Sequence, residues 1–196
     1  MNARHSLKVL PAVLIFGLVA AFSVSAHAAE TYKLDPTHTS VVFRVKHLGV
    51  AYVYGRFNGP TGSFVFDESS PAKSSIEVQV NTKDVDTAVD KRDNHLRSPD
   101  FFNAAEHPLV SFKSTSVKKL NNDTYDVAGN LTLIGKSLPL TVKARHTGSG
   151  KDPWGNFRRG FETSFTIKRS EFGMNFMLGG VSDEVVITVS VEGIRQ

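Results

Sequence analysis

The amino-acid sequence predicts an all-β protein of about eight or nine antiparallel strands with one short helical insertion. A barrel or a sandwich fits this pattern, and we predict an antiparallel barrel of about eight strands. Three observations predict this fold class. Apolar and polar residues alternate with period two through most of the chain, turn signals separate the alternating runs, and a single stretch, residues 86–103, breaks the pattern. Strands that are apolar on one face and polar on the other are typical of antiparallel sheets with one dry face.

The alternating runs follow one another along the chain. The first is 39–46, where apolar residues occupy alternate positions at Val41, Phe43 and Val45. Later runs repeat the pattern through Phe64 and Phe66; Ile76, Val78 and Val80; Val110 and Phe112; Tyr125, Val127, Leu131 and Leu133; Leu138, Leu140, Val142 and Ala144; Phe161, Phe165 and Ile167; Val185, Ile187, Val189 and Val191. Turn signals divide them at Asn58-Gly59-Pro60, Ser70-Pro71, Asn121-Asn122-Asp123, Gly135-Lys136 and Gly148–Gly155.

The insertion at 86–103 is predicted to be helical. Asp86 or Thr87 can act as the N-cap of a helix that runs to about Arg97. The dipeptide Ser98-Pro99 then has the pattern of a second helix start, with Ser as N-cap and Pro at the first helical position. One helical insertion in an otherwise all-β chain suits a cover or a plug at one end of a barrel.

The N-terminal residues have the pattern of an export signal. A basic start at Arg4 and Lys8 precedes an almost entirely apolar run at 9–24, and Ala26-His27-Ala28 fits the small-x-small cleavage pattern. We predict a signal peptide at 1–28, cleaved before about Ala29. A membrane anchor is the alternative, but the apolar run is shorter than the ~20 residues that a membrane-spanning helix needs.

The remaining residues, 29–196, are predicted to form one exported domain. The chain contains no cysteine, so its stability must come from packing and hydrogen bonds rather than disulfides. Acidic and basic residues are interspersed without a long basic run, which gives little support to a nucleic-acid role, and we predict no nucleic-acid partner.

In a closed barrel one face of each run points inward. We predict that the inward set lines a cavity for an apolar ligand and consists of Phe43, Val45, Tyr52, Tyr54, Phe64, Phe66, Ile76, Val78, Phe112, Leu131, Leu133, Leu140, Val142, Phe161 and Phe165. This set is nearly all apolar and carries no charge, as an apolar ligand requires. A filled core made of the same residues is the alternative, because alternation does not distinguish a filled barrel from a hollow one.

Arg92, His95 and Arg97 lie in the predicted helix and are candidates for a polar mouth of the cavity. Positions 92 and 95 are three residues apart and share a helix face. A guanidinium and an imidazole there can meet a diphosphate or a quinone oxygen. The alternative is that Arg92 and Asp93 are held in structural ion pairs that dock the helix on the barrel rim.

The sequence carries no signature of a catalytic or metal centre. The histidines of 29–196 stand singly, without the spacing of a zinc motif, at His38, His47, His95, His107 and His146. The chain has no G-x-S-x-G, no P-loop and no Rossmann fingerprint. We therefore predict no catalytic residue, no metal ligand and no required cofactor. A metal site assembled from distant strands is the remaining alternative.

The stretch RDNHLRSPDFFNAAEHPLVSF (92–112) resembles the central segment of the YceI-like family. The overlapping run 85–103 is the most specific, and Arg92, Asp93, His95, Leu96 and Arg97 match it one by one. The similarity continues through 35–49, 53–67, 107–117, 129–144, 152–162 and 169–176. The loop 174–180 is more hydrophobic than the family pattern, which predicts a different rim there.

The resemblance implies a bacterial, lipocalin-like β-barrel that holds a polyisoprenoid chain. The protein is then a periplasmic binding or carrier protein and not an enzyme, with a polyisoprenoid or an isoprenoid quinone as cargo. A role in stress response is implied in the same way. The implied partners are an apolar lipid and, transiently, a membrane, for a monomer or a homodimer.

Two other functions stay open at the level of sequence. A secreted hydrolase that acts on a lipid or a peptide requires a polar cluster facing into the barrel, and the inward set shows none. A non-catalytic interaction module requires an inward set too bulky to leave a void. Both alternatives therefore depend on what occupies the inside of the barrel.

Overall fold

The computed structural model describes residues 29–196, which form eleven strands. They are β1 (Glu30–Leu34), β2 (Ser40–His47), β3 (Ala51–Phe57), β4 (Thr61–Phe66), β5 (Ser75–Asn81), β6 (Val85–Asp86), β7 (Leu109–Lys119), β8 (Thr124–Leu133), β9 (Lys136–Lys151), β10 (Phe157–Lys168) and β11 (Val181–Arg195). The helical segments are η1 (Pro71–Lys73), η2 (Thr82–Asp84), α1 (Asp90–Arg97) and η3 (Arg169–Phe172). No helix in this part of the chain is long and apolar enough to cross a bilayer. The predicted signal peptide at 1–28 lies outside the described residues.

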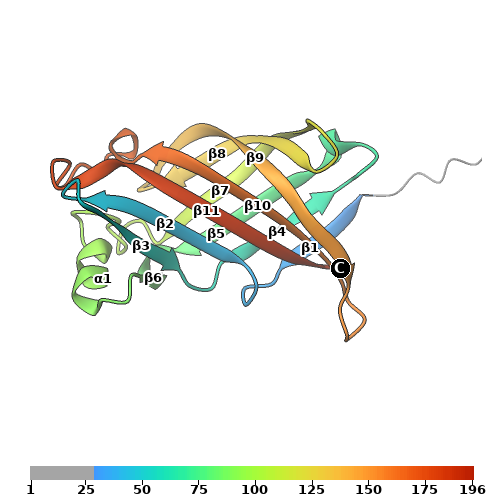
Figure 1. Ribbon diagram of the computed structural model, residues 1–196, viewed down its shortest axis with the longest axis horizontal. Helices are drawn as coiled ribbons and strands as arrows, with labels where there is room; N and C mark the ends of the chain where they lie inside the picture. The colour runs from blue at the N-terminus through green and yellow to red at the C-terminus, as the bar shows by residue number, and fades with distance from the viewer. Residues whose placement is uncertain (1–28) are drawn as a thin grey trace, which may run out of the picture.

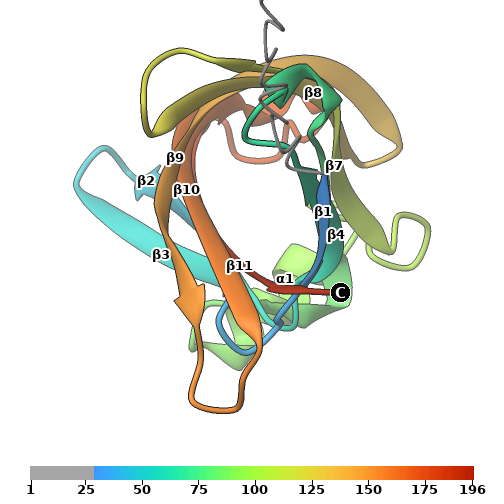
Figure 2. The ribbon, with the colours of Figure 1, turned by 90° about the vertical axis from the view of Figure 1, so that its right-hand side faces the viewer.

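Eight of the strands form a closed antiparallel barrel, which confirms the predicted fold class. Their order around the ring is β1-β4-β5-β7-β8-β9-β10-β11. β11 pairs with β1 to close the ring, with Tyr32 opposite Arg195 and Leu34 opposite Gly193. Figure 2 shows this ring seen from the end at which the chain terminates.

The last strand also joins the barrel to a second, smaller sheet. β11 pairs with β2 along 181–190 and with β1 only at 193–195. β2 pairs with β3, and β3 pairs with the short β6. This branch, β2-β3-β6, leaves the barrel wall, and its hairpin projects to the left in Figure 2. The run predicted at 39–46 is therefore a strand, but it belongs to the branch and not to the ring.

Helix α1 begins later than the sequence predicts. The turn before it holds Ala88 at a positive φ of 61°, and the Asp86 carboxylate accepts a hydrogen bond from the Ala88 N–H. The helix begins at Asp90, after Val89 in an extended conformation. Asp86 and Thr87 are therefore not N-caps, because the turn separates them from the first helical residue.

The predicted second helix start at Ser98-Pro99 is wrong. Ser98 follows the last residue of α1, and its hydroxyl donates a hydrogen bond to the carbonyl of His95. The chain then runs through turns to Pro108, whose carbonyl accepts a hydrogen bond from the Thr82 N–H. Helix α1 lies at one end of the barrel (Figure 1), where the insertion was expected to act as a cover.

Buried apolar residues gather in two clusters. The α1-end core contains Phe57, Val80, Val85, Phe101, Phe102, Leu131, Leu133, Ile167, Phe172 and Met174. The closed-end core contains Tyr32, Leu34, Phe64, Phe66, Val117, Tyr125, Val127, Val142 and Val191. Between them, inward-facing residues such as Phe43, Ile187 and Val189 are only half-buried.

Candidate ligand-binding cavity

A cavity of about 440 Å³ lies inside the barrel. Strands β4, β5 and β7 to β11 line it together with the branch strands β2 and β3, and α1 and the turns after it line one end. It reaches from Phe102 of the α1-end core to Tyr125 of the closed-end core. Its volume falls within the roughly 300–1,000 Å³ of small-molecule sites. The inward residues of the middle are half-buried because they face this space.

Most residues of the predicted inward set line the cavity. They are Phe43, Val45, Phe64, Phe66, Ile76, Val78, Phe112, Leu131, Leu133, Leu140, Val142, Phe161 and Phe165. Each lies on the dry side of its strand, as period-two alternation requires. Their contact with a ligand stays a prediction, but their place on the wall is set by the fold.

Tyr52 and Tyr54 do not point inward, which corrects the prediction for β3. They are 50% and 57% exposed. In the register of the β2–β3 hairpin, Tyr52 pairs with Lys46 and Tyr54 pairs with Arg44. Residues paired across an antiparallel ladder share a face, so both tyrosines lie on the outer face with these basic residues.

The inward positions of β3 beside the two tyrosines belong to smaller residues. Val53 pairs with Val45 and lines the cavity. Gly55 pairs with Phe43, and a Cβ atom at Gly55 would come within 2.3 Å of the Phe43 ring. The Phe43 ring therefore occupies the space that a side chain at position 55 would need, and only glycine fits there.

The sequence analysis missed several lining residues of the other strands, such as Val41, Val80 and Tyr125, and two larger groups. The first comes from β11, whose alternation was recognised but not assigned to the inward set: Val185, Ile187, Val189 and Val191. The second comes from α1, the turns after it and the loop before β11: Leu96, Phe101, Phe102, Met174 and Met177. Irregular segments have no periodic pattern from which inward-facing residues can be predicted. The unusual hydrophobicity of 174–180 was the only indication that this loop lines the cavity.

Arg92 and His95 line the cavity at the α1 end, where the polar mouth was predicted. The Arg92 guanidinium donates to the Thr87 hydroxyl over 2.7 Å and to the Thr87 carbonyl over 2.8 Å. His95 Nε2 lies 2.8 Å from the Asp100 carboxylate, and the His95 ring packs edge-on against Phe176. Both residues are thus positioned by neighbours, and their contact with a headgroup stays a prediction.

Arg97 does not line the cavity, which corrects its placement at the mouth. Its guanidinium instead donates to the carbonyls of Lys83 and Val85 over 2.7 and 2.9 Å. The buried Asp93 accepts hydrogen bonds from the Thr87 N–H over 2.9 Å and from the Thr87 hydroxyl. The helix is therefore docked by polar anchors, through hydrogen bonds and not through the ion pairs considered from the sequence.

Buried polar residues fill the opposite, closed end of the barrel. The Arg159 guanidinium lies over the Phe66 ring, 4.5 Å from its centre, and donates to the Tyr32 hydroxyl over 3.2 Å. The Tyr32 hydroxyl in turn donates to the Glu30 carboxylate. Burial, together with the charge of Arg159, lowers the pKa of His146 and keeps that imidazole neutral at neutral pH.

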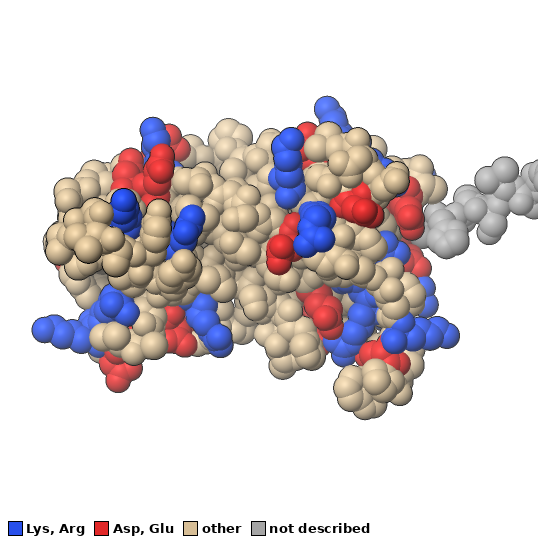
Figure 3. Space-filling view, in the orientation of Figure 1, with Lys and Arg blue, Asp and Glu red and all other residues tan. Residues whose placement is uncertain are grey.

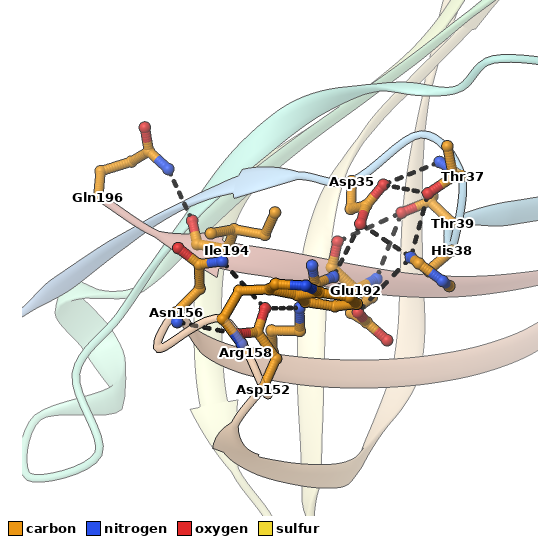
Figure 4. Close-up of polar contacts among 11 residues, drawn as sticks. Asp35, Thr37, His38, Thr39, Asp152, Asn156, Arg158, Glu192, Ile194 and Gln196 are labelled. Atoms are coloured by element: carbon orange, nitrogen blue, oxygen red, sulfur yellow. Dashed lines mark hydrogen bonds and ion pairs between the residues drawn. The ribbon is translucent and has the colours of Figure 1, made fainter.

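A network of ion pairs centred on Arg158 spans the strands that close the ring (Figure 4). Arg158 Nη1 lies 2.7 Å from Asp35, just after β1, and 2.5 Å from Glu192 on β11. Arg158 Nε lies 2.7 Å from Asp152, across the β9–β10 turn. The network thus connects three segments that are far apart in the sequence.

The same contacts shift the ionisation of both aspartates. The Thr37 hydroxyl, and then the Arg158 guanidinium, hold the pKa of Asp35 far below its ordinary value, against the opposing effect of burial. Desolvation alone would raise the pKa of Asp152, but hydrogen bonds from Arg158 and Asn156 outweigh it and lower this pKa to about 2. Both groups are therefore charged at neutral pH.

Asp35, His38 and Glu192 form the one group within residues 29–196 whose ligand atoms lie close enough to share a metal ion, within 4.8 Å of one another. The Arg158 guanidinium already bridges the two carboxylates, and a fixed positive charge there opposes the binding of a cation. We interpret the cluster as an ion-pair network. The absence of a metal site stays a prediction.

The cavity wall offers apolar contact far more than reactive groups. Polar lining residues at the α1 end include His47, Thr87, Arg92, His95 and Arg169, and a few others lie along the strands at Ser75, Gln79, Ser111, Glu162 and Thr163. The Arg169 guanidinium is occupied by the carbonyls of Met174 and Val181. Such a site can hold a long apolar molecule with its polar end near the mouth.

The sequence matches the family described as YceI-like domain over residues 32–193. This chain belongs to the YceI-like family. The YceI-like chain is 48% identical over 179 residues to a UPF0312 protein of Pseudomonas aeruginosa, covering 90% of this chain and 93% of that protein. It is 47% identical over 174 residues to a UPF0312 protein of Pectobacterium atrosepticum, covering 88% and 90% of the two chains.

Solved structures share the barrel of this YceI-like protein. The YCEI protein of Campylobacter jejuni aligns with a TM-score of 0.70 at 29% identity, over 77% of this chain and 90% of that one. BcnA of Burkholderia cenocepacia gives 0.75 at 23% identity over 81% and 98%. A polyisoprenoid binding domain from Saccharophagus degradans gives 0.64 at 14% identity over 84% and 98%. At these identities the last two establish the fold alone.

Proposed function

We propose that this YceI-like protein is a periplasmic carrier that holds a polyisoprenoid or an isoprenoid quinone inside its barrel. The observation that carries the proposal is the cavity itself, about 440 Å³ in volume with an almost wholly apolar wall. A filled interaction module would have no such space, and a hydrolase would need reactive groups on the wall. A binding protein for a long apolar molecule uses both features.

Burial of a hydrocarbon chain supplies affinity without specific polar contacts. Each carbon removed from water contributes ~0.8 kcal/mol, so about ten buried carbons offer roughly 8 kcal/mol before ordering costs. The wall residues of β11 and of the neighbouring strands are apolar and require no hydrogen bonds from the cargo. The length and shape of the apolar chain then determine which lipids fit.

The polar end of the cargo is proposed to lie beside Arg92 and His95. Nε and Nη2 of Arg92 are used by Thr87, so Nη1 is the donor that can serve a quinone or phosphate oxygen. His95 is held in place by Asp100 and presents its ring at the cavity wall. These two residues would orient the cargo, while the barrel supplies most of the affinity.

Two further observations support the choice of cargo and compartment. The Saccharophagus degradans domain that shares this fold is described as binding a polyisoprenoid. The export part of the proposal depends on the basic, apolar and small-residue pattern at 1–28.

Native mass spectrometry of the protein isolated from the periplasm tests the proposal. We expect a stoichiometric apolar lipid, which extraction would identify as a polyisoprenoid or a quinone. Protein that is empty, and that also fails to take up polyprenols and quinones, would refute the carrier function and favour an interaction module.

A matched pair of substitutions on β9 tests whether the cargo lies in the cavity. Leu140 lines the cavity, whereas the next residue, Thr141, is exposed on the outer face. Leu140→Trp should fill the space and abolish cargo binding while the circular dichroism spectrum stays unchanged. Thr141→Trp adds the same ring outside the barrel and should leave the cargo bound. If both variants carried equal amounts of cargo, the cargo would bind outside this cavity.

A further inference from the structure

An apolar rim lies at the α1 end of the molecule. We use this name for Leu48 and Val50 in the β2–β3 turn and for Phe176, Met177 and Leu178 in the loop before β11. Val50 is 83% exposed and Leu48 is 61% exposed. Single exposed apolar residues are common, but a contiguous group of them marks an interaction site.

The two loops of the apolar rim are fastened to each other by the backbone. The Leu48 N–H donates to the Gly180 carbonyl over 2.7 Å, and His47 pairs with Val181 in register. The N–H groups of Gly180 and Val181 both donate to the Met177 carbonyl, which closes the second loop on itself. The rim is therefore one preformed surface, at the left-hand end of Figure 1.

The apolar rim is continuous with the cavity. Met177 is 48% exposed and also lines the cavity, and His47 and Val181 line it directly behind the two loops. The ring of Phe176 packs edge-on against His95, with the ring centres 5.2 Å apart. A molecule that enters or leaves the cavity at this end therefore passes over the rim.

The two chain segments that carry the rim are basic or uncharged. The segment 36–66, which contains the whole β2–β3 hairpin, has no Asp or Glu, and 172–182 has no charged side chain at all. On the outer face of the hairpin, the Arg44 guanidinium lies 4.4 Å from the centre of the Tyr52 ring, and Lys46 pairs with Tyr52. In Figure 3 the upper part of this end is largely uncharged, whereas a basic side chain projects from its lower part.

We infer that the apolar rim is the surface by which this protein docks on an anionic phospholipid bilayer. Apolar side chains enter the acyl boundary, tyrosines settle at the headgroup level, and Lys and Arg pair with anionic headgroups. The β2–β3 hairpin presents these residue types in that order from its tip: Val50 first, then Tyr52 beside Lys46, then Tyr54 beside Arg44.

Charge favours a bilayer over a second copy of the chain. Two copies joined through the rim would bring two basic hairpins together, and like charges at an interface oppose association. Of the two carboxylates that follow the second loop, Asp183 is engaged within the chain and Glu184 lies opposite a lysine. Asp183 accepts hydrogen bonds from the N–H and the hydroxyl of Ser170, and Glu184 pairs in register with Lys168.

This inference deepens the proposed carrier function and rests on it for its biological purpose, because an isoprenoid cargo dissolves in bilayers and must be loaded from one. Docking itself can be measured without cargo. Vesicles that contain no polyisoprenoid or quinone test the apolar rim alone.

Cosedimentation with such vesicles is the experiment. We expect the full protein to bind vesicles of phosphatidylcholine mixed equally with phosphatidylglycerol, and to bind phosphatidylcholine alone more weakly. Added salt should reduce the first interaction, because it screens the basic hairpin. Val50→Glu combined with Leu178→Glu should weaken binding by about tenfold or more. Lys46→Gln should weaken it by about fivefold on the anionic vesicles only.

Matched controls lie at the other end of the barrel. Leu120, in the β7–β8 turn, is 46% exposed, and Lys118 is exposed just before it. Leu120→Glu and Lys118→Gln should leave vesicle binding unchanged. Trp154, the only tryptophan, is 78% exposed in the β9–β10 turn, so its fluorescence should not shift when vesicles are added. A blue shift would place docking at the wrong end and overturn the inference.

The remaining outcomes are also decisive. Equal vesicle binding by the wild type and by the Val50→Glu/Leu178→Glu variant would refute docking through the rim. A dimer in light scattering that the same substitutions abolish would assign the rim to a second copy instead. Failure of the carrier function has a different signature, since uptake of polyprenol from cyclodextrin would be absent in every variant while vesicle binding persists.

Discussion

The two ends of the barrel are built in different ways. At the closed end, β1 and β11 complete the ring through backbone pairing, and the Arg158 network connects the segments around them. At the α1 end, a short helix and turns cover the cavity, and side chains such as Asp93 and Arg97 tie them to the backbone. We predict from this comparison that stability is concentrated at one end of the molecule and that a ligand enters at the other.

The two ends differ in what must be broken to open them. Separating β1 from β11 breaks a continuous sheet and exposes the closed-end core, so it requires cooperative unfolding. Helix α1 fully buries only Asp93, and its single apolar residue, Leu96, is half-buried, so lifting the helix exposes little hydrophobic surface on the helix itself. Local opening at the α1 end is therefore the cheaper motion.

The largest expected effect comes from truncating the closed-end core. Phe66 packs against Tyr125 and Phe161, with ring centres 5.5 and 5.3 Å away, and is 6% exposed. Phe66→Ala should lower the free energy of unfolding by about 3–5 kcal/mol, measured by urea denaturation. The same change at the α1 end, Phe176→Ala, should cost about 0.5 kcal/mol or less. Equal losses would contradict the contrast between the ends.

The Arg158 network should make the closed end sensitive to acid. The folded pKa of Asp152 is about 2 and that of Asp35 is also lowered, whereas both are near 3.8 when unfolded. A lowered folded pKa gives stability above about pH 4 that is lost as pH falls toward 2. Arg158→Gln should lower the melting temperature at pH 7 and flatten this acid dependence. An unchanged slope between pH 4 and 2 would show that Arg158 does not set these pKa values.

Loosening the cover should affect cargo more than fold. Asp93→Ala leaves the Thr87 N–H without its acceptor and should ease local opening by about 1–3 kcal/mol. We expect cargo to dissociate about tenfold faster and the amides of α1 to exchange hydrogen sooner. Asp90→Ala, at an exposed position of the same helix, is the control and should change neither rate.

The smallest effect tests the register of the branch. Val53 lines the cavity, while its neighbour Tyr54 faces outward. Val53→Ser should weaken cargo binding by about fivefold, since it removes apolar contact worth about 1 kcal/mol. Tyr54→Ser should leave the affinity for cargo unchanged when the cargo is supplied from cyclodextrin. The reverse result would restore the inward orientation that the sequence suggested for Tyr54.

Period-two alternation was sufficient to place most of the cavity wall. Phe64 and Phe66, for example, lie between Ser63 and Asp67, so only one phase of the strand could face a dry interior. Alternation failed for Tyr52 and Tyr54 because the inward positions beside them hold only Val53 and Gly55, so the two tyrosines are the larger apolar residues of this stretch. In β3 the pairing register with β2 decides which residues face inward, and this register pairs the tyrosines with basic residues on the outer face.

Features that join distant segments could not be predicted. Arg158 and Asp35 are 123 residues apart, and the sequence around either residue does not indicate that the other is its partner. The branching of β11 was missed for the same reason, since it depends on which of two strands pairs with each half. The cover at Phe101 and Phe102 was expected as a helical insertion, but turns have no period from which to derive inward positions.

The place of β11 in the ring also has a consequence for how the protein is made. β11 is the last strand of the chain and pairs with β10, β2 and β1. Its contact between Tyr32 and Arg195 joins opposite ends of the domain. Neither the ring nor the branch can close while β11 is still being synthesised, and contacts of such long range slow folding. The barrel therefore forms only after β11 has been synthesised.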